Sequence, residues 1–159
     1  MRRTLLAGTG LLLAAIVALV VLVAGRGDGP DDVAADYLAA SWEGDWRTEC
    51  DLASEEWRRY LYEGHPFADC AAYAESAEAA LSEGGFADYA DDTDVNVSVE
   101  TRGDDDGRAR VAYVIEFRYH GDDRAGFDAL WQGGGAVDRG TIELVEVDGE
   151  WRVAGVDAG

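Results

Sequence analysis

The sequence predicts an α+β domain that follows an N-terminal transmembrane helix. Three observations support this: an uncharged stretch over residues 4–25, helical periodicity over residues 31–83, and alternating strand patterns between residues 94 and 156. Helices that precede a run of strands are typical of an α+β domain. We therefore expect helices packed on one face of a curved four-stranded antiparallel sheet.

The stretch over residues 4–25 is the expected membrane segment. It follows two arginines and carries no charge, and about 20 such residues cross the hydrocarbon core of a bilayer as a helix. Residues 1–25 therefore predict a single-pass anchor. A signal peptide cleaved near Ala24 is the alternative, although its apolar run is usually about 7–15 residues long. The basic start predicts a cytoplasmic N-terminus and an extracytoplasmic domain, which cleavage would release as a secreted protein.

Residues 26–30 form a short expected linker, and residues 31–159 are long enough to bury a core of their own. The chain has 33 acidic residues, all beyond Arg26, 13 basic residues and a net charge of −20. Such a negative field repels phosphates and argues against a nucleic-acid partner. The acidic bias has two kinds of explanation. The first is compositional, and it reflects genome composition or a salt-rich habitat. The second is functional, and it reflects a basic protein partner or cation binding.

The helical part divides at its glycines and at one proline. A first helix is expected from Pro30 to Gly44-Asp45, since proline suits the first helical turn and glycine the end. The apolar face of this helix comprises Val33, Tyr37, Leu38, Ser41 and Trp42. A short helix follows over Trp46–Leu52. A third should run from residue 54 to Gly64, with Trp57, Tyr60 and Leu61 on its inner face.

His65-Pro66 interrupts the chain, and a further helix is expected from Phe67 to Glu83. Its stripe comprises Cys70, Tyr73, Ala77 and Leu81. The pair Gly84-Gly85 ends it, and the helical pattern stops there.

Four strands are expected after this point, over Asp94–Arg102, Arg108–His120, Thr141–Val147 and Glu150–Val156. Residues 103–107 and Asp148-Gly149 are the expected hairpin turns, and Asp-Gly favours such turns. The inward face of the second strand comprises Ala109, Val111, Tyr113, Ile115, Phe117 and Tyr119. Trp151 and Val153 should face inward on the fourth strand. The connection over residues 121–140 is expected as a loop, either a mobile flap or an ordinary packed segment.

Cys50 and Cys70 are the only cysteines. An even count in an oxidising compartment favours a disulfide between neighbouring helices. Two buried free thiols and a metal pair are the alternatives. A zinc site normally needs four ligands, and the histidines available to complete one are His65 and His120.

The order of elements resembles the nuclear-transport-factor-2-like superfamily, the cystatin-like cone fold. Three features carry the likeness: the stretch VAADYLAASWEGDWRTECDLAS, the spacing of the two cysteines, and the terminal hairpin VEVDGEWRVAGV. The layout is similar to exported, N-terminally anchored actinobacterial members. The resemblance implies a cone-like domain. The superfamily includes isomerases, dehydratases, hydrolases and members without chemistry, so fold does not decide function.

The residues themselves supply no catalytic signature. Enzymes of this superfamily place an acid or base inside the cone, whereas the inward strand positions offer Tyr113 and Tyr119 without a carboxylate or histidine. A carboxylate on a helix, such as Asp45 or Asp69, would have to complete a site. His65 is expected in a turn and His120 on the outer face.

Metal binding is not expected either. Residues 92–96 begin like a calcium loop, but Val97 replaces the required glycine and Gly103 replaces the bidentate glutamate. No cofactor motif is present. The candidate pocket-lining residues are Tyr113, Phe117, Tyr119, Phe127 and Trp131.

These observations predict a membrane-tethered binding or interaction module without catalytic activity. Its partner would be an envelope protein or a small apolar ligand. The alternative is a cone-fold lyase or isomerase that acts on a small apolar ligand, with Tyr113 and an aspartate from a helix in its site.

Overall fold

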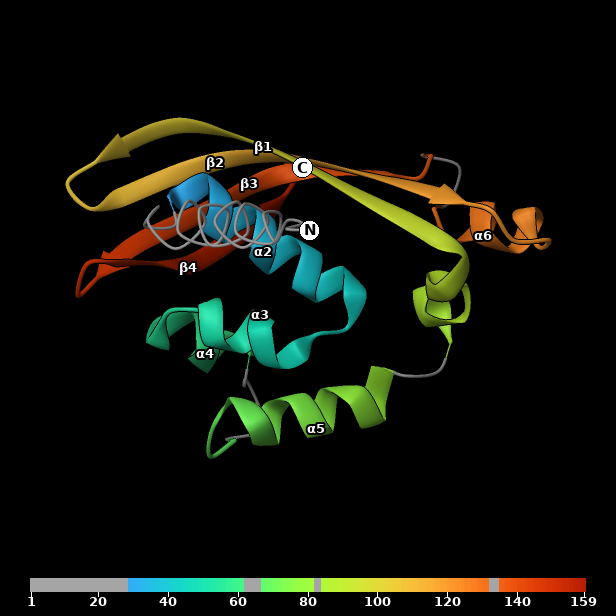
Figure 1. Ribbon diagram of the computed structural model, residues 1–159, viewed down its shortest axis with the longest axis horizontal. Coiled ribbons are helices and arrows are strands. Elements are labelled where there is room, and N and C mark those ends of the chain that lie inside the picture. The colour runs from blue at the N-terminus through green and yellow to red at the C-terminus, as the bar shows by residue number, and fades with distance from the viewer. Residues whose placement is uncertain (1–28, 62–66, 82–83, 132–134) are drawn as a thin grey trace, which may run out of the picture.

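A computed structural model describes residues 29–61, 67–81, 84–131 and 135–159 (Figure 1). The helical elements are α2 (Pro30–Glu43), α3 (Trp46–Leu52), α4 (Glu55–Leu61), α5 (Cys70–Leu81), the 3₁₀ helix η1 (Gly85–Asp92) and α6 (Arg124–Leu130). The strands are β1 (Thr93–Asp105), β2 (Arg108–Tyr119), β3 (Val137–Val147) and β4 (Glu150–Ala158). The expected anchor over residues 1–25 lies outside the described residues. Within the described ranges, no helix is long and apolar enough to cross a membrane.

The strands form one antiparallel sheet in the order β1-β2-β3-β4, as the sequence predicts. The turn between β3 and β4 is Asp148-Gly149, with φ values of 55° and 85°. The turn between β1 and β2 is only Asp106-Gly107, with φ values of 49° and 72°. Positive φ at both positions is what a two-residue hairpin loop requires, which explains the Asp-Gly pairs.

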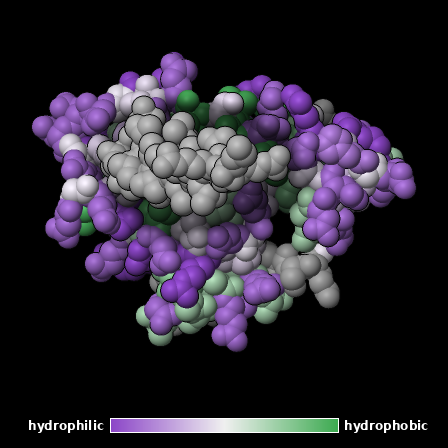
Figure 2. All heavy atoms as spheres, in the orientation of Figure 1, coloured by the Kyte–Doolittle hydropathy of each residue, from purple (hydrophilic) through white to green (hydrophobic). Residues whose placement is uncertain are grey.

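The core lies between the sheet and the helices that cover one of its faces. On β2 the buried side chains are Ala109, Val111, Tyr113, Ile115 and Phe117, as the alternation predicts. Helix α2 lies against all four strands and buries Val33, Tyr37 and Leu38 there. Helix α3 packs beneath α2, and α5 packs on α3 farther from the sheet (Figure 1). Hydrophilic side chains cover most of the described surface in the view of Figure 2.

Two short helical elements were not predicted. The expected helical signal ended at Gly84-Gly85, yet η1 continues from Gly85 to Asp92. The connection over residues 121–140, expected as a loop, contains α6. Both meet at the end of the sheet where β2 finishes (Figure 1).

Several predicted boundaries and one side-chain orientation were wrong. Helix α5 starts at Cys70 rather than Phe67, because the side chain of Asp69 accepts a hydrogen bond from Ala72 N (2.9 Å) and so caps the helix there. Tyr60 is 61% exposed. It stacks on Trp57 (4.6 Å between ring centroids) at the outer side of α4 instead of facing inward.

Candidate functional site

The turn between α2 and α3 brings two tryptophans to one surface groove. Trp42 lies in the last turn of α2, and Trp46 is the first residue of α3. Gly44 ends α2 with a φ of 75°, and an added Cβ there would lie 3.8 Å from Trp46 Nε1. Asp45 then caps α3 by accepting a hydrogen bond from Thr48 N at 3.1 Å. The glycine and the cap therefore fix the point at which α2 ends and α3 begins with Trp46.

This groove has a volume of about 470 Å³ and opens between the α2–α3 turn, α5 and η1. Small-molecule sites usually fall between about 300 and 1,000 Å³. We call it the tryptophan groove. It is lined by Ser41, Trp42, Glu43, Gly44, Trp46, Glu78, Gly84, Gly85, Phe86, Ala87 and Ala90. Its aromatic rings come from α2, α3 and η1, and its carboxylates come from α2 and α5.

Packed aromatic rings form the floor of the groove. The ring of Trp42 meets Phe86 edge-on at 5.2 Å and Phe117 at 4.6 Å between centroids. Phe117 in turn lies 4.6 Å from Trp131. Rings in such contact stabilise one another beyond their burial, by about 0.5–1.5 kcal/mol per pair. The groove therefore rests on the hydrophobic core.

The candidate pocket-lining residues lie within or against this core. Phe127 is 0% exposed, and its ring stacks on Tyr119 at 4.8 Å. Phe117 and Trp131 complete the same aromatic cluster, and none of these four residues lines the tryptophan groove. Their contact with a ligand stays a prediction.

Tyr113, the fifth candidate, has a carboxylate partner that the sequence did not indicate. Its hydroxyl lies 3.4 Å from Asp138 Oδ2, and Asp138 belongs to β3 rather than to a helix. Burial, followed by the charge of Asp138, raises the pKa of Tyr113 to about 12. The phenol therefore keeps its proton at neutral pH and acts as a donor.

The helix carboxylates considered for catalysis do not face the interior. Asp45 is exposed, and its hydrogen bonds to the Thr48 side chain and backbone lower its pKa. Asp69 is exposed at the start of α5. His120 is also exposed, as expected, and its Nε2 lies 2.8 Å from Asp94 Oδ2. His65 lies outside the described residues.

The segment expected as a flap or packed loop is packed where the structure describes it. Phe127 is buried, and Tyr119 accepts a hydrogen bond from Asp123 N at 3.3 Å. The backbone of Gly126 lies close to the side chain of Tyr89, since an added Cβ would lie 2.3 Å from Tyr89 Oη. Residues 132–134 lie outside the described residues.

A buried carboxylate that sequence reasoning missed joins three helices. Glu49 of α3 is 7% exposed and accepts hydrogen bonds from Ser41 Oγ (2.7 Å) and Tyr73 Oη (2.9 Å). Nearby, burial and then the charge of Glu49 raise the pKa of Tyr37, whose hydroxyl accepts from Trp57 Nε1 at 2.9 Å. Glutamate in a short helix gives no signal of burial, so only the tertiary structure identifies this network.

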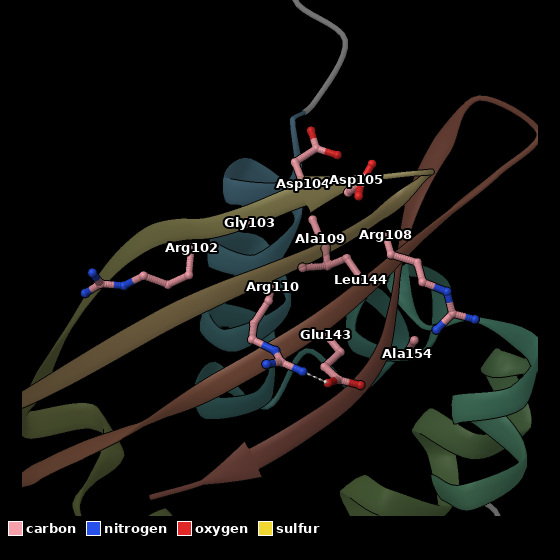
Figure 3. A pocket seen from close by; sticks show the side chains of 10 residues that line it. All are labelled: Arg102, Gly103, Asp104, Asp105, Arg108, Ala109, Arg110, Glu143, Leu144 and Ala154. Atoms are coloured by element: carbon pink, nitrogen blue, oxygen red, sulfur yellow. Dashed lines mark hydrogen bonds and ion pairs between the residues drawn. The ribbon is translucent and has the colours of Figure 1, made fainter.

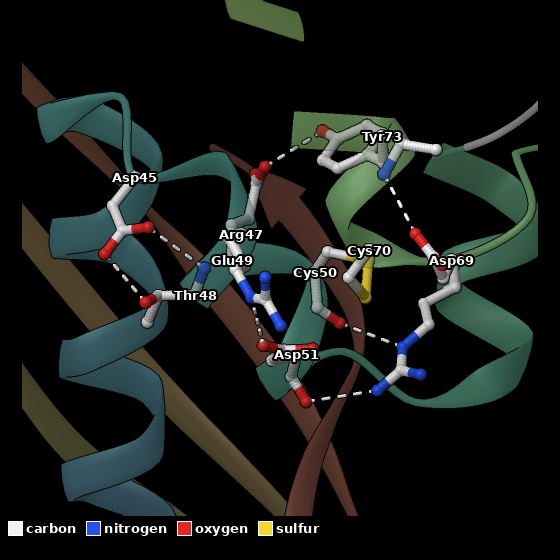
Figure 4. The surroundings of a disulfide bond; sticks show 11 residues. Asp45, Arg47, Thr48, Glu49, Cys50, Asp51, Asp69, Cys70 and Tyr73 are labelled. Carbon is white, nitrogen blue, oxygen red and sulfur yellow. Dashed lines mark hydrogen bonds and ion pairs between the residues drawn. A yellow bond between two sulfur atoms is a disulfide. The ribbon is translucent and has the colours of Figure 1, made fainter. Parts of the chain in front are cut away.

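The disulfide lies beside this network (Figure 4). Cys50 of α3 and Cys70 of α5 are bonded, with their Cα atoms 5.5 Å apart. Among the three alternatives from the sequence, the disulfide is confirmed. It fixes α5, which carries Glu78, against the rest of the domain.

A second hollow, of about 410 Å³, lies over the outer side of the β1–β2 hairpin end (Figure 3). Arg102, Arg108 and Arg110 line it together with Asp104 and Asp105. Arg110 pairs with Glu143 at 2.9 Å, and Arg102 pairs with Glu100 at 2.9 Å. Arginines and carboxylates both line this hollow, so it favours neither anionic nor cationic ligands. It also lacks an aromatic wall.

Neither the metal-binding side chains nor the comparisons with known proteins identify a function for this chain. Within the described ranges, no group of three or more His, Cys, Asp or Glu side chains is placed to hold a metal ion. No protein-family model matches the chain, and no curated protein matches it significantly.

Proposed function

We propose that this chain is a non-catalytic binding module, tethered to the outer side of a cell membrane by residues 4–25. The tryptophan groove carries the proposal, because it is the described hollow in which several aromatic rings and a few polar groups converge. That combination is typical of ligand sites. The Cys50–Cys70 disulfide supports an oxidising, extracytoplasmic location. The order of helices and the antiparallel sheet support a cone-like domain of the nuclear-transport-factor-2-like type.

The site is expected to bind a small ligand through Trp46. This side chain is half-buried at the first position of a helix, where alanine is well tolerated. Trp46→Ala should weaken binding of the neutral apolar dye Nile red by about tenfold, the equivalent of about 1.4 kcal/mol of lost contact. Dye fluorescence titrated with the full-length chain in a maltoside detergent would measure it.

Tyr60→Ala is the matched control, since Tyr60 is the exposed aromatic residue of α4 and lies outside the groove. It should leave the affinity within twofold of the unmodified chain, about the noise of such titrations. Equal affinities of the Trp46 and Tyr60 variants would contradict the groove as ligand site. The same pair of variants tests an envelope-protein partner, whose capture must depend on Trp46.

One observation favours an enzyme, the contact between Tyr113 and Asp138. A lyase or isomerase would use the protonated phenol as a general acid. Two features weigh against this reading: the contact is long at 3.4 Å, and Tyr113 is only 3% exposed. We therefore rank binding above catalysis.

The tether gives a separate expectation. The full-length chain should sediment with membranes and resist extraction by high salt, because about 20 uncharged residues insert stably into a bilayer. A C-terminal tag should be digested by protease added to intact spheroplasts. A mature N-terminus near Arg26 in the soluble fraction would instead establish the cleaved signal peptide. Immunoblotting and N-terminal sequencing distinguish the two.

A further inference from the structure

We propose that the ligand of the tryptophan groove is a small, free quaternary ammonium ion, a cation that carries no anionic group of its own. This inference rests on the proposed function and adds the chemistry of the ligand. Its basis is the combination of aromatic rings, a carboxylate rim and the absence of basic side chains from the described residues that line the groove.

The aromatic rings of the groove suit a cation whose charged nitrogen has no N–H group to donate. Trp42, Trp46 and Phe86 supply two indoles and one phenyl ring. The negative faces of such rings attract a positive charge within about 6 Å, and tryptophan does so most strongly. The methyl groups of a quaternary ammonium spread this charge over an apolar surface. The same rings therefore meet both its charge and its shape.

The rim supplies the opposite charge. Glu43 at the end of α2 and Glu78 on α5 both line the groove and are exposed. Neither is paired with an arginine among the ion pairs of the described residues. The chain as a whole has a net charge of −20, which raises the local concentration of cations near such a site.

The lining also disfavours an attached phosphate or carboxylate. Among the residues that the structure describes, no arginine lines the tryptophan groove, whereas three line the hollow at the β1–β2 hairpin. A zwitterionic lipid headgroup would bring its phosphate towards Glu43 and Glu78 without a basic partner, and like charges repel. A free cation avoids this repulsion. We therefore assign the site to a free compound and not to a lipid surface.

Tryptophan fluorescence of the full-length chain in a maltoside detergent tests the proposal. Choline and its neutral isostere 3,3-dimethyl-1-butanol would be titrated at constant ionic strength, together with phosphocholine and glycerophosphocholine, the water-soluble headgroup of phosphatidylcholine. Choline should bind at least about fivefold more tightly than the neutral isostere, the gain expected from a cation over aromatic rings. Phosphocholine and glycerophosphocholine should bind more weakly than choline.

Charge variants on one helix provide the matched comparison. Glu78→Gln should weaken choline binding by about two- to fivefold and leave binding of the neutral isostere unchanged, because an exposed carboxylate contributes modestly. Glu75→Gln removes the same charge from the same helix, outside the groove. It should change neither affinity. Equal losses of choline affinity in both variants would attribute the effect to the net charge of the chain and overturn the proposal.

The outcomes separate the ligand chemistry from the proposed function. Equal affinity for choline and its neutral isostere, both weakened by Trp46→Ala, overturns the cation and leaves the binding module intact. Tighter binding of phosphocholine or of glycerophosphocholine than of choline overturns the assignment to a free cation without an anionic group. If neither choline nor the isostere binds, the cation is overturned, and Nile red binding by the Trp46 and Tyr60 variants decides on the binding module.

Discussion

Phe127→Ala is expected to destabilise the domain by about 3–5 kcal/mol, the usual range for deleting a buried phenyl ring. Phe127 is 0% exposed and contacts Tyr119, Tyr89 and Trp131 through its ring. Helix α6 has only seven residues, too few to be stable by itself. Its position therefore depends on this side chain. Urea unfolding of the full-length chain in a mild detergent, followed by tryptophan fluorescence, would measure the loss.

Asp128→Ala is the control on the same helix. Asp128 pairs with Arg124 at 2.9 Å, but both side chains are more than half exposed, and such a pair contributes about 0–1 kcal/mol. Phe127→Leu should lie between the two variants, because leucine keeps part of the apolar volume. A loss below about 1 kcal/mol for Phe127→Ala would mean that α6 is a surface flap and not part of the core.

The long periodic elements could be predicted from the sequence, whereas a short element could be predicted only where the residues beside it mark its start. Helix α3 spans Trp46–Leu52, as predicted, because Asp45 and the glycine before it mark its start. The alternation along β2 predicted its buried face correctly over residues 109–117. Elements η1 and α6 have eight and seven residues, about two turns each, too few for periodicity to show.

The strand ends were missed for a different reason. Strand β1 continues past Thr101 through an irregularity in its register, so Gly103 and the two following aspartates belong to the strand. Strand β3 begins at Val137, ahead of the predicted Thr141. Gly140 interrupts the alternation there, and an added Cβ would lie 2.2 Å from Asp157 O. Glycine at this position allows the strands to pack closely, although in the sequence a glycine here predicts a loop.

The candidate site needed the tertiary structure. The predicted pocket residues come from the apolar face of β2 and from residues 127 and 131, and they form core. The tryptophan groove combines the end of one helix with α5 and with an unpredicted 3₁₀ helix. Sequence patterns show which side chains are buried. They do not show where two layers separate and leave aromatic rings accessible.

The disulfide gives the second large expected effect. Replacing Cys50 and Cys70 together by alanine should destabilise the domain by roughly 3 kcal/mol, since the bridge spans 20 residues and restricts the unfolded chain. This corresponds to a decrease in melting temperature of about 10 °C for a domain of this size. Thermal unfolding followed by circular dichroism would measure it. When the chain without substitutions is denatured in the absence of a reductant, thiol labelling should find no free cysteine.

The same change should loosen one wall of the tryptophan groove. Among the described elements, α5 packs chiefly on α3, held by the bridge and by the hydrogen bond between Tyr73 and Glu49. Without the bridge, α5 and its Glu78 are held only by noncovalent contacts. Groove affinity for Nile red should therefore fall even well below the melting temperature. Ile142→Ala in β3 is the control, because it costs about 2–5 kcal/mol but leaves α5 in place. Equal loss of affinity in both variants would attribute the effect to global stability, whereas a larger loss without the bridge assigns α5 to the binding site.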